Sequence, residues 1–315
     1  MSRFPETEWI WRNGELIPWA DASVHILSHA VQFGSSAFEG VRCYATPRGP
    51  AIFRIEDHLQ RLINSCKIYR TELAYSVEDL VAACCEVVER NKMEACYMRP
   101  MVVRGLGAIS ILPFDSPADV YVPCWPWGAL LGEGALENGV DVCVASWHRM
   151  APNSFPSMAK IAGNYLGSQL IKMEAAANGF AEAIALGPEG MLSEGSGQNV
   201  FLVRGGTLFT TNVDGTLLPG ITRASIITLA HDLGIPVLEQ PLPREALYTA
   251  EEVFFSGTAA EITPVRSVDR IKVGPGKPGP ITGQLQRRFL DVAKGVAADI
   301  HGWLTYVRAE RASAR

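Results

Sequence analysis

The alternation of apolar and polar residues predicts two amphipathic helices in the first third of the chain. In residues 55–69 (IEDHLQRLINSCKIY), apolar side chains recur at every third or fourth position: Leu59, Leu62, Ile63 and Cys66. This spacing places them on one face of a helix, which buries that face against a core. Residues 77–91 repeat the pattern and predict a second helix.

Short apolar runs between turn signals predict strands around these helices. Residues 8–18 (EWIWRNGELIP) are typical of a hairpin with Asn13-Gly14 at its turn, because this dipeptide adopts the positive φ that tight turns require. We expect a second hairpin from residues 38–44 and 51–54, which flank a turn segment rich in proline and glycine, residues 47–50 (PRGP). Further strands are expected over residues 95–105 and 119–125.

A glycine-rich segment without a strand pattern, residues 128–139 (GALLGEGALENG), marks the expected domain boundary. It separates a small N-terminal α/β domain, residues 1–127, from a larger domain, residues 140–315. In the larger domain the pattern predicts several strands, helices over residues 164–179 and 223–233, and a long closing helix over residues 281–304. The expected fold class is α/β (α+β mixed).

The composition favours a globular protein and disfavours nucleic acid as a partner. Of the 315 residues, 48% are hydrophobic and 19% are charged, and the net charge of −5 without a basic stripe disfavours nucleic acid as a partner. No run approaches the roughly 20 apolar residues of a membrane-spanning helix, and the start of the sequence lacks a signal-peptide pattern, so we expect a cytoplasmic protein. The seven cysteines form no CxxC pair and are expected to be buried and reduced, and no metal-binding motif is present.

Lys160 is a candidate nucleophile. It is one of seven lysines and lies in a stretch of small and apolar residues, SMAKIAG. An amine among apolar neighbours is suited to attack on a carbonyl group. The alternative is a structural lysine at a strand end whose amine reaches solvent, and this alternative is favoured when the residue is considered alone.

Glu194 and two small-residue turns are the other unusual features. Glu194 precedes a very apolar strand, and its carboxylate is suited either to a protonated ring nitrogen or, more simply, to a solvated turn. The segment 217–223 (LLPGITR) runs into a helix whose N-terminal N–H groups and Thr222 hydroxyl suit a phosphate, although Thr222 as a plain N-cap is an equally simple explanation. The segment 255–261 (FSGTAAE) offers a second anion-binding turn.

Together these features indicate a site for pyridoxal 5′-phosphate. An amine, a carboxylate and two hydroxyl-bearing anion turns match the aldehyde, the ring nitrogen and the phosphate of this cofactor. The sequence contains neither a Walker pattern nor a GxGxxG turn after a strand, which disfavours nucleotide binding.

Seven segments, in order along nearly the whole chain, carry a family resemblance. They are SHAVQFGSSAFEGVRCY, FRIEDHLQRL, CYMRP, SMAKIAGNYLGSQLIKMEA, LSEGSGQNVFLV, LLPGITR and SGTAAEITPV. The sequence resembles the class IV (fold-type IV) pyridoxal phosphate-dependent aminotransferases, and among them the branched-chain amino acid aminotransferases. The resemblance implies a two-domain fold like that of D-amino acid aminotransferase, in which the larger C-terminal domain forms a pseudo-barrel, and a homodimer or higher homo-oligomer. It also implies a site between the domains that the partner subunit closes.

The resemblance also implies a role for each residue that matches a family motif. Lys160 would form the Schiff base with the cofactor and move the proton during transamination. Glu194 would hold the ring nitrogen protonated, Tyr165 would bind the phenolic oxygen, and Leu218 would pack on the ring. The residues expected at the phosphate are Arg61, Ile221, Thr222 and Thr258. Those expected at the substrate are Phe38, Gly40, Arg42, Tyr97, Arg99, Gly257, Thr258 and Ala259.

Some of these positions have simpler explanations, and three features depart from the family pattern. Arg99, expected to meet the distal carboxylate of glutamate or 2-oxoglutarate, is alternatively a surface strand cation, and Phe38 is alternatively plain core. Phe33 and Leu130 stand where the family often has tyrosine, and the loop at residues 106–113 (LGAISILP) lacks the usual Gly-Asn-Pro pattern. The loss of two hydroxyls makes the expected pocket more apolar and affects substrate specificity.

The expected activity is transamination between branched-chain L-amino acids and 2-oxoglutarate. The nearest alternative is an (R)-selective amine or D-amino acid transaminase of the same fold, which Arg42, Tyr97 and Arg99 disfavour because they supply groups for substrate carboxylates. A pyridoxal phosphate-dependent lyase is a more distant alternative. A non-catalytic protein of this fold is disfavoured because a binding module needs no paired amine and acid.

Overall fold

The computed structural model describes residues 5–107, 109–128 and 130–308, and the chain forms two compact units. The first unit comprises Met1–Gly128, Ala159–Gly163 and Asp291–Arg315, and the second comprises Ala129–Met158 and Asn164–Leu290. The domains expected from the sequence are continuous, whereas the first unit also includes residues 159–163 and 291–315, which the sequence analysis assigned to the larger domain. The division at residues 128–139 stays a prediction, and its residue 129, like residue 108 of the expected loop at 106–113, lies outside the described residues.

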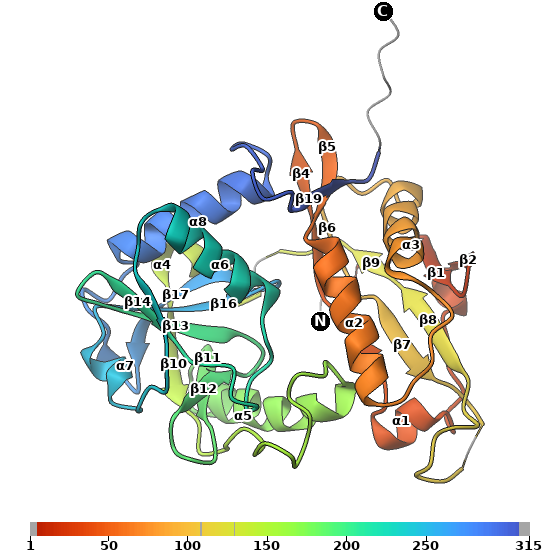
Figure 1. Cartoon of the computed structure of the whole chain (residues 1–315), viewed down its shortest axis with the longest axis horizontal. Helices are drawn as coiled ribbons and strands as arrows, with labels where there is room; N and C mark the ends of the chain where they lie inside the picture. The colour runs from red at the N-terminus through yellow and green to blue at the C-terminus, as the bar shows by residue number, and fades with distance from the viewer. Residues whose placement is uncertain (1–4, 108, 129, 309–315) are drawn as a thin grey trace, which may run out of the picture. The chain divides into compact units, whose positions relative to one another are not determined.

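Two antiparallel sheets form the framework of the first unit (Figure 1). One has the strand order β2-β1-β8-β7-β3, and its strands are β1 (Trp9–Arg12), β2 (Glu15–Pro18), β3 (Ala37–Phe38), β7 (Met101–Arg104) and β8 (Ala118–Val122). The other has the order β19-β5-β4-β6-β9, and its strands are β4 (Val41–Thr46), β5 (Gly49–Phe53), β6 (Cys96–Met98), β9 (Cys124–Trp125) and β19 (Leu304–Tyr306).

The hairpin predicted at residues 8–18 is confirmed, and the second hairpin is only partly correct. Strands β1 and β2 pair across Asn13 and Gly14, which have φ of 48° and 99°. Strands β4 and β5 pair as expected, but Phe38 lies in β3 and pairs with Met101 in the other sheet. The chain crosses between the sheets immediately after Phe38, where the N–H of Glu39 donates to Pro100 O at 2.8 Å.

The two helices predicted from apolar spacing are confirmed as α2 (Ile55–Ile68) and α3 (Val77–Arg90). Each buries one face in a common core, with Leu59 and Leu62 from α2 and Leu80 and Val87 from α3 fully buried. A capping box of Ser76 and Asp79 satisfies backbone N–H groups at the start of α3. The described part of this unit also contains two short helices, η1 (Trp19–Asp21) and α1 (His29–Phe33).

A nine-stranded mixed sheet dominates the second unit (Figure 1). Its order is β12-β11-β10-β17-β16-β13-β14-β15, with β18 paired to β17. The strands are β10 (Val140–Val144), β11 (Glu182–Leu186), β12 (Leu192–Gly195), β13 (Asn199–Arg204), β14 (Thr207–Thr210), β15 (Val237–Glu239), β16 (Glu252–Gly257), β17 (Glu261–Val268) and β18 (Ile271–Lys272). Its helices are α4 (Ala135–Asn138), η2 (Ala162–Asn164), α5 (Tyr165–Ala177), α6 (Ile221–Asp232), α7 (Ala246–Thr249) and α8 (Pro280–Ala293), of which η2 begins and α8 ends in residues of the first unit. The mixed α/β fold predicted from the sequence is confirmed.

The closing helix predicted over residues 281–304 is wrong in its second half. Helix α8 ends at Ala293, and the N–H groups of Gly295 and Val296 close it by donating to Val292 O and Asp291 O. This is the pattern of a Schellman cap, which requires the left-handed conformation that Gly295 adopts at φ 65°. The chain then returns as β19, which pairs antiparallel with β5.

Two findings bear on the composition-based expectations. All seven cysteines are free, and six of them are buried, as expected. In the part of the chain that the structure describes, no helix has the length and apolar character needed to cross a membrane.

Candidate active site

Lys160 is held by backbone hydrogen bonds in the first unit. Its carbonyl oxygen accepts from the N–H of Phe38 at 3.0 Å, and the adjacent Ile161 forms a β-bridge with Ala37. Its own N–H donates to Ser65 Oγ at 2.9 Å. The side chain is half-buried, and Nζ lies 5.0 Å from the centroid of the Phe38 ring. The amine therefore faces an aromatic wall, and Phe38 contacts a polar group in addition to filling space.

Arg99 lies between β6 and β7 among aromatic rings. Its guanidinium carbon is 5.1 Å from the Phe38 ring centroid, 5.6 Å from that of Tyr97 and 5.9 Å from that of Trp125. Within the described residues, its buried Nε has no hydrogen-bond partner. A surface strand cation does not have these surroundings, so that alternative is wrong. A cation enclosed by rings with an unsatisfied donor is suited to an anionic ligand.

Gly40 and Arg42 lie in the same region. A Cβ at Gly40 would lie 1.9 Å from the hydroxyl oxygen of Tyr97, so only glycine fits beside this ring. Arg42 lies in β4 opposite Tyr97, and its Nη2 donates to Gly128 O at 2.9 Å. Trp127 extends the aromatic cluster, with its ring 5.3 Å from that of Tyr97. Sequence reasoning did not select Trp125 or Trp127.

Arg61 is fixed by a buried carboxylate that sequence reasoning missed. Its Nε and Nη2 donate to the two oxygens of Glu39 at 2.7 and 2.8 Å, which is a bidentate fork. His58 Nδ1 lies 2.7 Å from Glu39 Oε2, and the N–H of Gly40 donates to the same oxygen at 3.2 Å. The side chains of Glu39 and His58 are almost completely buried. We call Glu39, His58 and Arg61 the Glu39 cluster.

The acid and the imidazole of the Glu39 cluster both have a pKa below the usual range of their type. Burial raises the pKa of Glu39, but the charge of Arg61 and the hydrogen bond to His58 outweigh it and hold the pKa well below its usual range. Burial lowers the pKa of His58, against the opposing effect of Glu39. The polar residues His58 and Arg61 interrupt the apolar pattern of α2. This interruption is the sequence signal by which the cluster could have been found.

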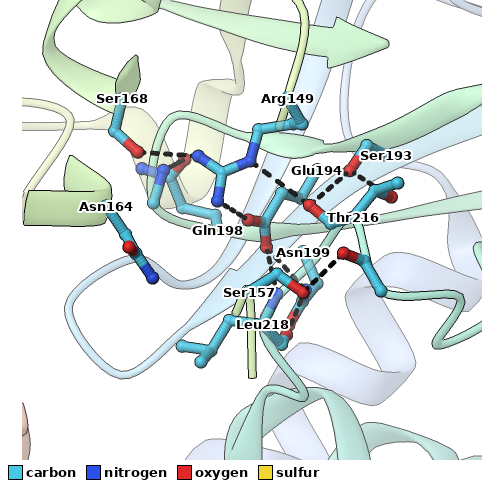
Figure 2. A network of polar contacts seen from close by, with 12 residues as sticks. Arg149, Ser157, Asn164, Ser168, Ser193, Glu194, Gln198, Asn199, Thr216 and Leu218 are labelled. Carbon is cyan, nitrogen blue, oxygen red and sulfur yellow. Dashed lines mark hydrogen bonds and ion pairs between the residues drawn. The ribbon is translucent and has the colours of Figure 1, made fainter. Parts of the chain in front are cut away.

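Glu194 lies in β12 and is buried, with 4% of its surface exposed. Its Oε1 is 2.7 Å from Nη2 of Arg149, and its Oε2 accepts from Asn199 Nδ2 and from the N–H of Leu218, both at 3.2 Å (Figure 2). The solvated-turn alternative is therefore wrong. A buried carboxylate held by a guanidinium is an acceptor suited to a protonated ring nitrogen. We call Glu194, Arg149, Asn199 and Leu218 the Glu194 network.

Arg149, which sequence reasoning also missed, supports the Glu194 network. Besides its contact with Glu194, its Nη1 donates to Ser168 Oγ at 2.8 Å and its Nε donates to Thr216 O at 3.4 Å (Figure 2). All three nitrogens of the guanidinium thus have protein acceptors. No motif in the sequence marks this arginine, because its partners lie 19 to 67 positions away along the chain.

Helix α6 begins at the expected phosphate turn. Gly220 is its N-cap and Ile221 its first residue, so Thr222 occupies the second helical position and is not the N-cap. The N-cap residue is a glycine and has no side chain to cap the helix, and the N-terminal N–H groups of such a helix suit an anion. A Cβ at Gly220 would lie 2.0 Å from Asn199 Oδ1, so glycine is required there and joins the turn to the Glu194 network.

The second anion turn connects β16 to β17. Gly257 ends β16, Thr258 and Ala259 form the turn, and the strands pair from Gly257 opposite Glu261 onward. In this turn region Ser256 is 1% exposed, and its Oγ finds no hydrogen-bond partner among the described residues. A buried hydroxyl without a partner indicates a place where a polar ligand atom or a water completes the structure. Tyr165, the first residue of α5, is half-buried.

The structure thus gathers the expected residues into two sets, one in each unit. The first unit contains Phe38, Gly40, Arg42, Arg61, Tyr97, Arg99 and Lys160. The second contains Tyr165, Glu194, Leu218, Ile221, Thr222, Gly257, Thr258 and Ala259. Among the departures from the family pattern, Phe33 is 44% exposed in α1 and Leu130 is 39% exposed.

The residues present fit pyridoxal 5′-phosphate chemically. The amine of Lys160 suits an aldehyde, the carboxylate of Glu194 suits a ring N–H, and the N-terminal N–H groups of α6 suit a phosphate. The unsatisfied buried hydroxyl of Ser256 suits a further polar atom. No group in the donor set conflicts with that cofactor within the described residues.

Comparison with known proteins agrees with this chemistry. The profile of the amino-transferase class IV family matches residues 36–268. The branched-chain-amino-acid aminotransferase of Escherichia coli K12 is 49% identical over 303 residues, which are 96% of this chain and 98% of that protein. A crystal structure of the E. coli enzyme has a TM-score of 0.95 at 48% identity and covers 96% of this chain and 100% of that one.

Two structures of the T.th. branched-chain amino acid aminotransferase are also similar. One, with pyridoxamine 5′-phosphate, has a TM-score of 0.93 at 43% identity, and the other, with N-(5′-phosphopyridoxyl)-L-glutamate, has 0.92 at 42% identity. Both cover 96% of this chain and 100% of the matched chain. Because the family profile matches well over half of the chain and these relatives match nearly all of it, the chain belongs to the class IV aminotransferases.

Proposed function

We propose that this protein is a pyridoxal 5′-phosphate-dependent aminotransferase that transfers the amino group of leucine, isoleucine or valine to 2-oxoglutarate. The observation that carries the proposal is the near-complete, 49% identical match to a branched-chain-amino-acid aminotransferase. The pyridoxamine phosphate and phosphopyridoxyl-glutamate complexes of the T.th. relative support the cofactor and the glutamate side of the reaction.

Lys160 and Glu194 act on the reacting atoms in this proposal. The cofactor, when bound, supplies an aldehyde that captures amines and a ring that accepts electron density. Lys160 Nζ binds the aldehyde and then moves a proton as general base and acid. Glu194 holds the ring N–H through its carboxylate, which the Arg149 guanidinium keeps in place. Tyr165 donates to the phenolic oxygen, and Leu218 packs on the ring face.

Phosphate binding in this proposal uses a guanidinium and backbone N–H groups. Arg61 presents its guanidinium, held by the Glu39 fork, and Ile221 and Thr222 present the N-terminal N–H groups of α6. Thr258 supplies a further hydroxyl. We infer that the orphan hydroxyl of Ser256 is satisfied when a ligand occupies this region.

Substrate binding combines apolar walls with fixed cations. Phe38, Tyr97 and Trp125 surround the Arg99 guanidinium and leave its Nε as a donor for a carboxylate. The other residues proposed to bind the substrate are Gly40, Arg42 and the turn residues Gly257 and Ala259. The same walls accept a branched apolar side chain, and the cation accepts the distal carboxylate of 2-oxoglutarate.

The experiment is a donor panel. Purified protein with pyridoxal 5′-phosphate receives L-leucine, D-alanine or (R)-1-phenylethylamine with 2-oxoglutarate, and glutamate formation is measured. L-leucine is expected to be the best donor, in agreement with relatives that are all named for branched-chain amino acids. The proposal fails if L-leucine is the poorest donor.

Adduct mapping tests the role of Lys160. Borohydride reduction of the holoenzyme followed by peptide mapping is expected to label the segment that contains Lys160. Lys160→Ala is expected to lose the label and the turnover but keep the fold. Lys92→Ala, at a turn in the first unit, is the control and is expected to keep the label and the turnover. A label on another lysine, or wild-type turnover in Lys160→Ala, would contradict the assignment.

We further propose that the protein is cytoplasmic and works as a homodimer or higher homo-oligomer. Family membership supports both, and size-exclusion chromatography with light scattering checks the second. A monomer with full activity would contradict it.

A further inference from the structure

Ser65 links the backbone of Lys160 to helix α2. Its hydroxyl is fully buried and has two contacts: it donates to Arg61 O at 2.8 Å and accepts from the N–H of Lys160 at 2.9 Å. A hydroxyl has one proton and two lone pairs. Because the proton is used in the bond to Arg61 O, the oxygen is left as an acceptor that points at the lysine.

Three further bonds around this segment are between backbone groups. Phe38 N donates to Lys160 O, Ala162 N donates to Ser36 O, and Gly163 N donates to Gly34 O, at 2.8 to 3.0 Å. Any residue except proline could supply these bonds. The N–H of Lys160 faces α2 instead, where the Ser65 side chain is its acceptor. Ser65 is therefore a point at which the identity of a side chain affects the position of the lysine backbone.

These contacts close a ring through the Glu39 cluster. The N–H of Lys160 donates to Ser65, whose hydroxyl donates to the backbone of Arg61. The Arg61 side chain then donates to Glu39. Glu39 follows Phe38 in the chain, and the N–H of Phe38 donates to Lys160 O, which closes the ring. Every hydrogen bond in the ring is between 2.7 and 3.0 Å. The ring joins the amine-bearing residue to the guanidinium that the proposed function places at the phosphate.

We propose that Ser65 is a positioning residue that fixes the spacing between the Lys160 amine and the Arg61 guanidinium. This inference rests on the proposed function, because only there do the two groups hold two ends of one ligand. Without the Ser65 hydroxyl, the N–H of Lys160 loses its buried acceptor and the ring opens at one point. A displacement of a reacting group by about 1 Å costs up to about a hundredfold in rate.

The test compares Ser65→Ala with Cys66→Ala. Both variants remove one buried heavy atom from neighbouring positions of α2, but Cys66 packs in the core and does not supply the acceptor for Lys160. Three quantities are measured for each holoenzyme: the rate of the half-reaction with L-leucine, the pH midpoint of the visible absorption band of the lysine-bound cofactor, and hydrogen exchange of the peptide that contains Lys160.

Ser65→Ala is expected to slow the half-reaction by roughly tenfold to a hundredfold, to shift the pH midpoint of the band, and to speed exchange at the Lys160 amide. Cys66→Ala is expected to lower thermal stability and leave all three unchanged. The inference is overturned if Ser65→Ala matches the wild type in rate and midpoint, or if Cys66→Ala produces the same shifts. In the event that Ser65→Ala does not fold, Ser65→Cys, which keeps the side-chain length with a weaker acceptor, decides by the same criteria.

The wild-type protein separates this inference from the proposed function. A wild type without an absorption band or L-leucine turnover contradicts the proposed function itself. A wild type with both, together with an unaffected Ser65→Ala, contradicts only the role of Ser65.

Discussion

Two buried glutamates, one in each unit, are bound by arginines in opposite ways. Glu39 accepts the Nε–Nη2 edge of Arg61, and Glu194 accepts Nη2 of Arg149. Arg149 also donates to Ser168 and Thr216, so the protein surrounds its guanidinium. Glu39 is the fully enclosed partner in the other pair, with 0% of its side chain exposed against 15% for Arg61.

The difference indicates which partner of each pair serves the ligand. In the Glu39 cluster the acid is the support and the arginine is presented, which suits a phosphate. In the Glu194 network the two side chains are equally buried, with 7% of Arg149 and 6% of Glu194 exposed, and the proposed function assigns the acid to a ring N–H. Under the proposed function, a buried ion pair serves an anion in one place and a cation in the other, and three measurements test this contrast.

The largest effect is expected on stability from Glu39→Gln. The change leaves the Arg61 guanidinium beside a neutral amide in a buried setting, and breaking such a pair costs about 3–5 kcal/mol. Urea unfolding of the two proteins measures the loss. Glu56→Gln, at an exposed position of α2, is the control and is expected to change little. An equal, small loss in both variants would show that Glu39 is not a structural support.

Glu194→Gln is expected to act more on catalysis than on folding. Arg149 keeps Ser168 and Thr216 as acceptors, so the loss of stability is about 1–3 kcal/mol, less than for Glu39→Gln. The half-reaction is expected to slow by roughly a hundredfold, because an amide is a weaker acceptor for a ring N–H. Single-turnover kinetics measure the rate, with exposed Glu189→Gln as control. Wild-type rates in Glu194→Gln would contradict the proposed role of the acid.

The smallest effect is a pH dependence of stability at the Glu39 cluster. The pKa of His58 is lowered in the folded state, so below about pH 6.5 the unfolded chain binds a proton there that the folded protein excludes. Stability therefore falls as the pH falls from about 7.5 to about 5.5, by at most about 1.4 kcal/mol per pH unit from this group. Glu39 adds nothing in this range because its own pKa is lowered and its contribution is lost only at more acidic pH.

Urea midpoints at about pH 7.5 and about pH 5.5 measure this dependence, and His58→Gln isolates it. The amide keeps a donor for Glu39 but does not titrate, so the difference between the two midpoints is expected to shrink. Glu39, Arg61 and Lys160 are the charged groups that act on the imidazole. An unchanged difference in His58→Gln would place the pH sensitivity elsewhere.

Local patterns in the sequence predicted much of the fold. Helices α2 and α3 follow from apolar spacing, and the first hairpin follows from Asn13-Gly14. The errors arose where distant parts of the chain decide the structure. Phe38 joins the sheet of Met101, and Leu304–Tyr306 form a strand because β5 offers an edge, although local pattern alone favoured a continued helix.

The sequence predicted the site residues that lie in recognisable motifs. It did not predict those whose role depends on contact with a residue far away in the chain. Lys160, Glu194 and the turn before α6 stand out as chemistry in small or apolar surroundings. Glu39, Ser65 and Arg149 do not, because their significance lies in contacts that span 19 to 95 positions. Periodicity carries no information on such pairs, and only the folded chain shows that each acid and its arginine meet.

The antiparallel return of Leu304–Tyr306 onto β5 has a consequence for biosynthesis. The second unit is formed by residues that lie between parts of the first, and β19 is the last strand made among the described residues. During translation the outer edge of β5 stays open while the whole second unit emerges and folds. A chaperone that shields exposed strand edges would therefore find a target at β5 of the nascent chain until residues 304–306 emerge and pair with it.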